Sequence, residues 1–589
     1  MSSENTDTSA DVVVCGGGLA GLTLALQLRQ RLPEASIVVL ERQRRPLPEA
    51  CHKVGESTVE VGARYFGHVL GLRDHLLERH LPKNGLRFFS GPSERTLDAR
   101  SEMGPREAPS VPAYQIDRGR FENDLRARCE AAGIDLREGW GVRAIALGEG
   151  GAAHRVTAIA TRAEAAPMAL TARWVIDATG RRRMIVKDRG LHRDLPAQAS
   201  SSWFRVPERI DVAELAAPDA RGWHERDVDD NRWLSTNHLC GTGYWVWIIP
   251  LSTGHTSVGI VAEAARHDFR GFSTEQAARD WLETHEPRLA ARLDGVPFAD
   301  FIAMKDYRYG VERWVSPDRW ACVGEAGLFV DPLYSPGSDV IGLGNTLTCE
   351  LIADDLDGPG LDPARVEELN GFLLDWTALL TRTLCLGSMV MGKPEVFGAK
   401  LYWDYYYYWS CLCPYFFQDL YRLPVDEHRR FRAMLNRYAE LNERAQRVLQ
   451  AWAEVAPDEP AQPFVGLPAI ATTLSDLHLA LLEDETPEQA HARMERGLRW
   501  GEELIAELLL RALRRAGPSR AAELAERIGL ETWPRVGPDR LAADEASPRA
   551  RRKLLSRPVR DMERSIGKNT APSPDAPSLR ELWKLARPR

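Results

Sequence analysis

The feature that most constrains the fold is one run near the N-terminus, DVVVCGGGLAGLTLALQLRQRLPEASIVVLER. Residues 11–14 predict a short buried strand, residues 22–32 continue with apolar positions at helical spacing, and residues 36–40 predict a second strand. Three glycines in the spacing GxGxxG stand at the turn into the helix: Gly16, Gly18 and Gly21. Strand, glycine turn, helix and strand in this order predict a parallel βαβ unit and therefore an α/β fold.

Each glycine has a physical role in such a unit. Gly16 permits the tight turn, Gly18 lets the backbone approach a pyrophosphate at the helix N-terminus, and Gly21 lets the helix pack closely on the strand. Glu41 ends the second strand, where a carboxylate can accept hydrogen bonds from ribose hydroxyls. The unit therefore predicts a dinucleotide-binding domain, and by itself it leaves FAD and NAD as alternatives.

Four later segments favour FAD. VGES at residues 54–57 lies one short loop after the second strand, where a flavin protein can cover its isoalloxazine ring, and QIDRGRF at residues 115–121 opens a helix with an arginine near the cofactor. WVIDATG at residues 174–180 is an apolar strand that brings the backbone to the cofactor a second time. Residues 319–345 read as a strand, an Asp-Pro turn and a glycine-rich helix start, whose free N–H groups favour an electron-rich group such as the flavin ring edge. The cofactor-binding residues predicted on these segments are Arg118, Asp177, Gly180, Asp331 and Gly337.

These segments, in this order, resemble the FAD-dependent monooxygenase superfamily of the p-hydroxybenzoate hydroxylase type over residues 10–350. The resemblance implies a Rossmann-like FAD-binding domain, which we place at residues 1–195 and 310–355. Residues 196–309 contain alternating strands and are predicted to form the antiparallel β-sheet of a substrate domain. The sequence has no second GxGxxG, so we expect reduced FAD to come from a separate flavin reductase.

The strand YWVWIIP carries two tryptophans on one face. Side chains alternate along a strand, so Trp245, Trp247 and Ile249 share a face, a pattern typical of an ordinary core strand. Within the superfamily, WxWxIP marks the flavin-dependent halogenases, and this sequence resembles them at every fixed position of the motif. The resemblance implies that Trp245 and Trp247 separate the flavin from the substrate, so that halide is oxidised instead of the organic molecule.

The resemblance also implies a lysine between flavin and substrate. Lys83, in HLPKNGLRFF just before an expected strand, is our candidate. Its ammonium would hydrogen-bond hypohalous acid and present it to an electron-rich carbon, and partial burial would lower its pKa. A surface loop lysine is the structural alternative, and Lys53 in CHKVGES is the rival candidate, better placed to face phosphate or solvent.

Two departures from the family pattern follow Asp331-Pro332. Tyr334 stands where halogenases of free tryptophan carry a glutamate, which points away from indole substrates and makes Tyr334 a candidate substrate residue. Pro336 stands where the family has a residue with a backbone N–H that helps to hold halide. Gly337 and Ser338 remain as the candidate halide donors, and we expect a weaker halide site.

The C-terminal half is predicted to be a mostly helical domain over residues 360–545, followed by a basic, partly disordered tail over residues 546–589. The segment LYWDYYYYWSCLCPYFFQDLY, from residue 401, holds four consecutive tyrosines that cannot all face one core. It predicts either the mouth of a tunnel for an aromatic or lipophilic substrate or a domain interface.

Charge and composition bear on partners and compartment. The formal net charge is −8, yet residues 549–589 hold 12 Lys/Arg against 4 Asp/Glu, so the tail is either a solvated extension or a dock for an acidic acyl carrier protein. Nine cysteines without a metal spacing, and no apolar run of membrane length, predict a cytoplasmic protein with neither metal nor disulfide. We expect no nucleic-acid partner and no membrane span.

The prediction from the sequence is an FAD-dependent halogenase of secondary metabolism. It would use FADH2, O2 and chloride or bromide to halogenate an electron-rich aromatic or polyketide-like substrate, free or tethered to a carrier protein. One alternative is a flavin-dependent monooxygenase or oxidoreductase without halogenation, which Pro336 favours. Another is a catalytically idle flavin-fold partner in a biosynthetic assembly.

Overall fold

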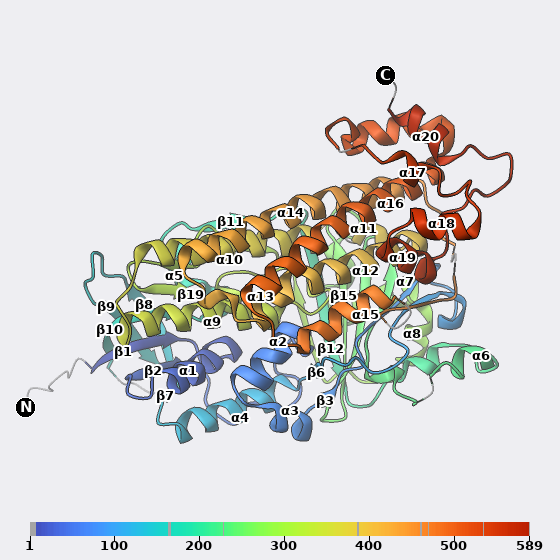
Figure 1. Ribbon diagram of the computed structural model, residues 1–589. Coiled ribbons are helices and arrows are strands. Elements are labelled where there is room, and N and C mark those ends of the chain that lie inside the picture. The colour runs from blue at the N-terminus through green and yellow to red at the C-terminus, as the bar shows by residue number, and fades with distance from the viewer. Residues whose placement is uncertain are drawn as a thin grey trace, which may run out of the picture.

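The computed structural model describes residues 8–162, 166–227, 229–385, 388–459, 462–468, 471–533 and 535–587. Two sheets with their covering helices lie in the lower half of Figure 1, and long helices lie above them. Residues 1–7 and 588–589 of the predicted domains are outside the described residues. The α/β fold class is confirmed.

The first sheet contains the predicted βαβ unit, β1 (Thr8–Cys15), α1 (Leu19–Arg31) and β2 (Ile37–Glu41). Its strand order is β18-β19-β10-β1-β2-β7, and β10, β1, β2 and β7 run parallel, as do β10 and β19. Strand β1 is almost entirely buried, because helices cover both faces of a parallel sheet. The other strands are β7 (Asp135–Glu138), β8 (Trp140–Ala146), β9 (His154–Ala160), β10 (Met168–Asp177), β18 (Val315–Ser316) and β19 (Trp320–Cys322).

The second sheet has the order β16-β12-β15-β14-β13-β4-β5-β20. Strands β12 to β16 are antiparallel and lie within the predicted substrate domain, but β4, β5 and β20 come from outside residues 196–309. Strand β4 pairs in parallel with the edge of β13 that β14 leaves free, β5 pairs antiparallel with β4, and β20 pairs in parallel with β5. The sheet is therefore mixed, and its strands are β4 (Leu86–Ser90), β5 (Ser101–Gly104), β12 (Ala199–Val206), β13 (Thr236–Gly241), β14 (Tyr244–Pro250), β15 (Thr256–Glu263), β16 (Asp300–Met304) and β20 (Phe464–Gly466).

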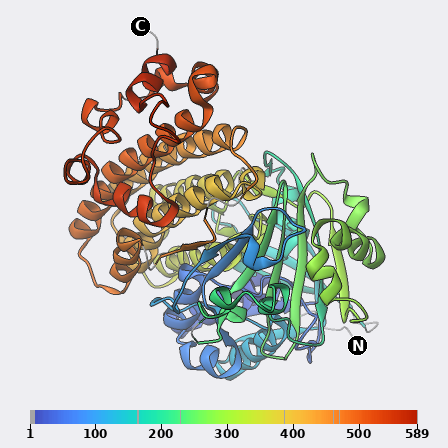
Figure 2. The ribbon, with the colours of Figure 1, turned by 90° about the vertical axis from the view of Figure 1, so that its right-hand side faces the viewer.

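The two faces of β14 enter different cores, as the period of two predicts. Trp245, Trp247 and Ile249 belong to the large core that faces the first sheet and the long helices. Val246 and Ile248 belong to a smaller core on the opposite face, covered by α7 (Glu275–His285) and α8 (Pro287–Arg292). Figure 2 shows the second sheet edge-on between these two environments.

Long helices form the third part. α10 (Pro363–Cys385), α14 (Val425–Ala453) and α16 (Pro487–Ile528) run side by side in Figure 1 and pack on one another. α16 changes direction at Gly517, whose φ of 68° is left-handed, and Pro518 follows it. The other helical elements that bear on the site are α9 (Gly337–Leu356), α12 (Pro394–Tyr407), a π-helical turn (Tyr408–Leu412), α13 (Cys413–Phe417) and α15 (Thr472–Leu479).

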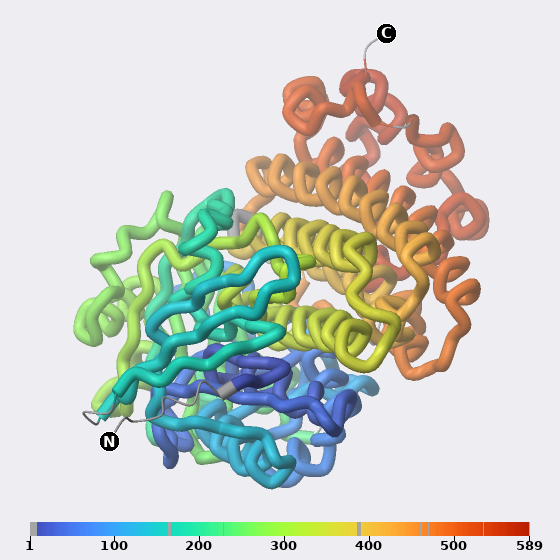
Figure 3. Tube along the Cα trace, turned by 90° about the vertical axis from the view of Figure 1, so that its left-hand side faces the viewer, coloured from blue at the N-terminus to red at the C-terminus, as the bar shows by residue number. Residues whose placement is uncertain are grey.

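The segment predicted as a partly disordered tail contains three helices in its described residues, α18 (Pro548–Leu554), α19 (Arg557–Ile566) and α20 (Leu579–Ala586). Val559, Met562 and Leu582 are buried, because apolar residues at helical spacing give these helices a face to pack. Figure 3 shows the segment on the outer side of the long helices. In the part of the chain that the structure describes, no helix combines the length and the apolar character needed to cross a membrane.

Candidate active site

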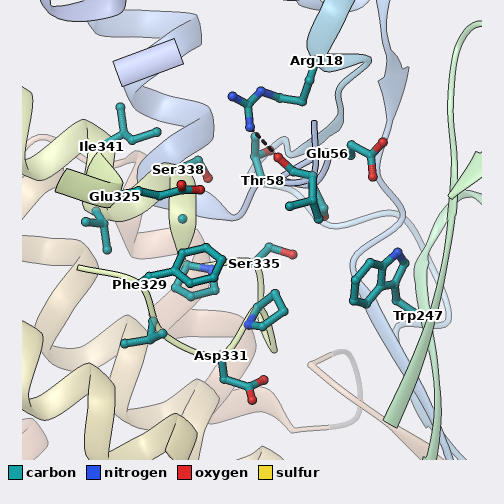
Figure 4. A pocket seen from close by; sticks show the side chains of 18 of the residues that line it. Glu56, Thr58, Arg118, Trp247, Glu325, Phe329, Asp331, Ser335, Ser338 and Ile341 are labelled. Atoms are coloured by element: carbon teal, nitrogen blue, oxygen red, sulfur yellow. Dashed lines mark hydrogen bonds between the residues drawn. The ribbon is translucent and has the colours of Figure 1, made fainter. Parts of the chain in front are cut away.

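A first cavity lies between the start of α1, the start of α9 and the tryptophan face of β14. Figure 4 shows Trp247 on one side of this cavity and Ser335, Ser338 and Glu325 on the other. Its wall combines backbone from four distant segments with the tryptophan face; lining residues include Leu19, Val54, Gly55, Glu56, Ser57, Thr58, Arg118, Trp203, His238, Trp245, Trp247, Gly324, Asp331, Pro332, Ser335, Pro336, Gly337 and Ser338.

The glycine turn has no room for side chains. A Cβ on Gly16 would lie 2.2 Å from the carbonyl oxygen of Ala178, and its φ of +124° is one that other residues rarely adopt. A Cβ on Gly21 would lie 1.9 Å from the carbonyl oxygen of Gly16, where α1 meets β1. Gly18 caps α1, and Lys53 Nζ would stand 3.4 Å from a Cβ there. The backbone thus leads directly to the free N–H groups of α1.

Glu41 lies beside this turn, where the sequence predicted it. Its Oε2 accepts a hydrogen bond of 2.8 Å from the Gly17 N–H, and its Oε1 accepts one of 2.8 Å from the Gln43 N–H. These bonds hold the carboxylate at the carboxyl end of β2. Each oxygen keeps a lone pair that a ribose hydroxyl could use.

Arg118 borders the first cavity at the start of α4 (Arg118–Ala131). It donates to the Val54 carbonyl at 2.6 Å and to Glu122 at 2.6 Å, so it is held in place before any ligand binds. Glu122 also accepts from Lys53 at 3.0 Å, which identifies Lys53 as a residue of this cofactor side and not of the substrate side.

Asp177 and Gly180 lie at the turn after β10 and are not among the residues that line the cavity. The Asp177 carboxylate accepts from the backbone N–H groups of Thr179 and Ile185, and its burial raises its pKa. Gly180 has a left-handed φ of 58°. Asp177 therefore fixes the turn after β10 and does not itself reach the cavity.

Asp331 does line the cavity, and the structure adds a partner that the sequence did not reveal. Its Oδ2 accepts from Arg308 and, at 3.1 Å, from the Tyr307 hydroxyl, while Oδ1 accepts from the Leu333 N–H. The Asp-Pro turn is thus tied to the second sheet's far edge. The buried ion pair with Arg308 fixes the position at which α9 begins.

The VGES loop is fixed by a second buried arginine. Arg205 on β12 donates to Glu56 Oε1 at 2.7 Å, to Asp300 at 2.8 Å and to the Lys53 carbonyl at 2.6 Å. Glu56 Oε2, which belongs to the cavity wall, has no partner among the described residues. Nothing in the sequence around Arg205 distinguishes it from a strand residue, so it was missed.

Trp245 and Trp247 are 2% and 3% exposed and form the sheet side of the first cavity. Trp247 Nε1 donates to Ser257, and Gly259 on β15 gives its indole room, because a Cβ there would lie 2.1 Å from the ring. Trp245 Nε1 is buried without a partner in the described chain. An indole wall therefore closes one side of the cavity.

A second cavity adjoins the first. Residues 54–58 line the first cavity and residues 59–60 the second, while Pro336 lines both. The four-tyrosine segment contributes Tyr405, Tyr407 and Tyr408, so it does line a cavity, and the remaining tyrosine, Tyr406, packs against α16. The other lining residues are Lys83, Gly85, Leu86, Pro105, Pro109, Val111, Ala113, Tyr334, Asp339, Leu380, Thr383, Asp404, Trp409, Leu412, Leu467, Pro468 and His478.

Lys83 lies in the wall between the two cavities. It is 4% exposed, and its Nζ donates to the Thr58 carbonyl, a first-cavity residue, at 2.7 Å. Burial lowers the pKa of Lys83 from 10.5 to about 7, while Glu60 and Asp339 partly oppose that shift. The surface-loop alternative for Lys83 is therefore wrong.

The start of α9 supplies the remaining predicted residues. Tyr334 has a left-handed φ of 65° and donates to Asp404 at 2.8 Å in the second cavity. Pro336 is the N-cap, so Gly337 and Ser338 in the first helical turn keep N–H groups without an acceptor inside the helix. Both residues line the first cavity, while Asp339, the next residue, lines the second.

The first cavity fits FAD. Glycines stand where side chains would collide, at Gly16 and at Gly55, whose Cβ would lie 2.7 Å from Arg118. The first residues of two helices line it, Leu19 of α1 and Gly337 of α9, and the free N–H groups of helix N-termini suit a pyrophosphate and an electron-rich ring edge. Buried polar atoms without partners, on Glu56, Trp203 and Trp245, border the space between them.

Comparison with known proteins agrees with an FAD site in the first cavity. The model of the FAD binding domain family matches residues 9–325. This chain belongs to the FAD binding domain family. The flavin-dependent halogenase chlA of Dictyostelium discoideum is 26% identical over 446 residues, which cover 70% of this FAD-binding chain and 72% of the relative.

A second relative and a solved structure are also similar to this chain. The 1H-pyrrole-2-carbonyl-(peptidyl-carrier protein) chlorinase of Pseudomonas fluorescens is 26% identical over 354 residues, or 57% of this chain and 74% of that protein. The crystal structure of halogenase PltM has a TM-score of 0.60 at 17% identity and covers 82% of this chain and 99% of that chain. The predicted resemblance to flavin-dependent halogenases is confirmed: the two relatives named here are halogenases, and PltM shares the fold.

Proposed function

We propose that the two cavities divide the labour of an FAD-dependent halogenase, with the flavin in the first and an electron-rich aromatic or polyketide-like substrate in the second. The observation that carries this proposal is the place of Lys83, buried in the wall that separates them. When bound in its reduced state, FAD would supply two of the four electrons that reduce O2, and chloride or bromide would supply the other two and become hypohalous acid. Residues of this chain would exclude the substrate from the flavin, bind the halide and position the hypohalous acid.

Trp245 and Trp247 exclude the substrate from the flavin side, since the indoles belong to the wall of the first cavity and not of the second. Hypohalous acid, which is small, passes from the first cavity toward Lys83. The ammonium donates a hydrogen bond to its oxygen and holds it near the substrate carbon. A pKa of about 7 keeps a large part of the Lys83 population protonated at neutral pH.

The halide site uses the first turn of α9. Backbone N–H groups of Gly337 and Ser338 are the donors we assign, and Pro336 contributes none because proline lacks an N–H. Two donors at a helix N-terminus still bind an anion. We therefore expect halide dependence with weak affinity.

Tyr334 limits the second cavity on the side of α12, where its hydroxyl is fixed by Asp404. Aromatic and aliphatic side chains provide most of the remaining wall. This wall suits a phenolic or pyrrolic ring better than a charged amino acid. Halogenase PltM has been crystallised with phloroglucinol and FAD, so phloroglucinol and other phenols are sensible first probes here.

Lys83→Ala tests the proposal. With FADH2, O2 and bromide or chloride, and a panel of free phenols and a pyrrole-2-carbonyl thioester, wild type should give halogenated products by mass spectrometry. The variant should lose more than about 100-fold in product while FAD binding and O2 consumption persist, because the positioned donor is gone. Lys305→Ala, at a lysine that is 67% exposed, is the matched control and should halogenate like wild type. Halogenation unchanged in Lys83→Ala would remove Lys83 from the mechanism.

A flavin reductase and an acyl carrier protein are the partners we propose. The carrier-protein substrate printed in the name of the Pseudomonas chlorinase supports the second, and so does the exposed basic surface of α18 at Arg549, Arg552 and Lys553. Charge reversal of these three residues should weaken carrier-protein binding at low salt by several-fold, with the difference vanishing at high salt. An affinity that does not change would leave α18 as ordinary solvated surface.

A further inference from the structure

The second cavity contains three carboxyl groups, and they differ in their partners. Asp404 faces Lys400 at 2.7 Å and also accepts from Gln446 and Tyr334. Glu60 pairs with His478 at 3.0 Å. Asp339 has only neutral partners in the described chain: Oδ1 accepts from the Gly62 N–H at 2.8 Å, and Oδ2 accepts from the Tyr408 hydroxyl at 2.5 Å.

Among the carboxyl, amine and imidazole groups that line this cavity in the described residues, Asp339 and Lys83 are thus the two without a counter-ion in contact. Both are buried, at 2% and 4% exposure, and no carboxylate of the described residues lies within 4.0 Å of the Lys83 ammonium. Burying a carboxylate beside neutral donors costs folding free energy. A functional role for Asp339 would explain why the protein tolerates this cost. A matched acid and base that face one cavity are arranged to exchange protons with what occupies it.

Halogenation of an aromatic ring needs a proton donor and a proton acceptor. Resting on the proposed function, we propose that Asp339 accepts the proton that the ring carbon loses and that Lys83 supplies the proton that leaves with the oxygen of hypohalous acid. Asp339 is then a catalytic residue in addition to Lys83. The two groups form a closed proton cycle within the second cavity.

The step balances. The ring carbon attacks the halogen of hypohalous acid, so a carbon–halogen bond forms as the halogen–oxygen bond breaks. The departing hydroxide takes a proton from Lys83 Nζ and becomes water, and the ring carbon passes its proton to the Asp339 carboxylate. The released water then carries that proton from Asp339 back to Lys83, which restores the ammonium and the carboxylate.

Burial acts in opposite senses on the two groups and brings their pKa values together. Burial raises the pKa of Asp339 from 3.8 to about 7, and burial lowers that of Lys83 to about 7. The hydrogen bonds from Tyr408 and Gly62 act in the opposite sense on Asp339. Other titratable groups that face the pair from neighbouring elements are Glu60, His238, Asp404, Cys413 and His478.

Asp339→Asn tests the proposal, because the amide keeps the size of the side chain but cannot take a proton. The probe is 4-methylphenol, compared with the same phenol deuterated next to the hydroxyl, and monochlorodimedone traps free hypohalous acid. We expect kcat to fall by about 100-fold, a ring deuterium isotope effect to appear, and the trapping rate to stay at the wild-type level. Wild-type kcat without an isotope effect would overturn the proposal, whereas an absent trap signal in wild type would contradict the proposed function instead.

Tyr408→Phe tests whether Asp339 acts in proton transfer, because a purely structural role of Asp339 would leave the pH dependence of kcat unchanged. Loss of the hydroxyl removes a hydrogen bond that favours the Asp339 carboxylate, so the acid limb of the kcat–pH profile should move to higher pH. Infrared titration of the protein without substrate completes the test. A protonated carboxyl band that titrates near neutral pH and is missing in Asp339→Asn is expected; its absence from wild type would overturn the proton cycle.

Discussion

The two cavities are built in different ways. The first is lined by segments that are distant from one another in the sequence, but several of them are turns or helix starts with a glycine, such as Gly55, Gly324 and Gly337. The second is lined mainly by side chains, many of them from α12, the π-helical turn after it and the segment of residues 83–113, with buried ionisable groups among aromatic rings. A cofactor site of the first kind leaves a local pattern in the sequence, and a substrate site of the second kind depends on how helices pack.

Gly16→Ala should break the first cavity and gives the largest expected effect. The new Cβ collides with the Ala178 carbonyl at a φ of +124°, so we expect a loss of about 3 kcal/mol or more in stability and no retained FAD. The measurements are urea unfolding and flavin absorbance of the purified protein. Gly344→Ala, where the added methyl meets open space in α9, is the control and should be neutral or stabilising. Retention of FAD by the Gly16→Ala variant would contradict the inference that the turn has no room for a side chain at Gly16.

Lys83→Met should show that a residue of the second cavity lowers stability in return for function, because we expect the variant to be more stable than wild type and inactive. The unfolded chain binds the Lys83 proton more tightly than the folded chain between pH 7 and 10.5, so the stability from this group rises with pH across that interval. The variant should exceed wild type by about 2 kcal/mol or more at pH 7, and the gap should narrow by about pH 9. Urea unfolding at both pH values measures it. A gap that is independent of pH would mean that Lys83 has the same pKa in the folded and unfolded protein.

Tyr334→Phe and Tyr407→Phe compare two hydroxyls of the second cavity. The Tyr334 hydroxyl donates to Asp404, whereas the buried Tyr407 hydroxyl has no partner among the described residues. Thermal unfolding should show a loss of about 1–3 kcal/mol for Tyr334→Phe and less than about 0.5 kcal/mol for Tyr407→Phe. Equal losses would indicate that Tyr407 has a partner, such as a bound water.

Sequence reasoning reached the first cavity because its constraints are local. The order and spacing of Gly16, Gly18, Gly21 and Glu41 fix a turn, and β14 alternates as its residues require. Asp177 differs from the other predicted residues, because it accepts hydrogen bonds from the turn after β10 and does not line the cavity. Arg205 and Arg308 hold this site together, yet they act through contacts more than 20 residues away, which no spacing encodes.

The second cavity could be predicted only in outline. Lys83 and Tyr334 were found through family resemblance, and four adjacent tyrosines indicated a cavity without saying which side chains enter it. Asp339 stands beside two predicted halide donors and still escaped notice. A single residue step along the first turn of α9 rotates the side chain by about 100°, which carries it from one cavity to the other.

Pro336 borders both spaces, and its rigid ring has a consequence for anyone who wishes to re-engineer this protein. In the proposed function, Pro336 limits both the halide site and the passage between the cavities, so a substitution that adds an N–H donor for chloride would also change the shape of that passage. Selection for a new halogen should therefore alter which molecules are modified. Libraries that vary this position together with its neighbours on both sides will find solutions that single changes miss.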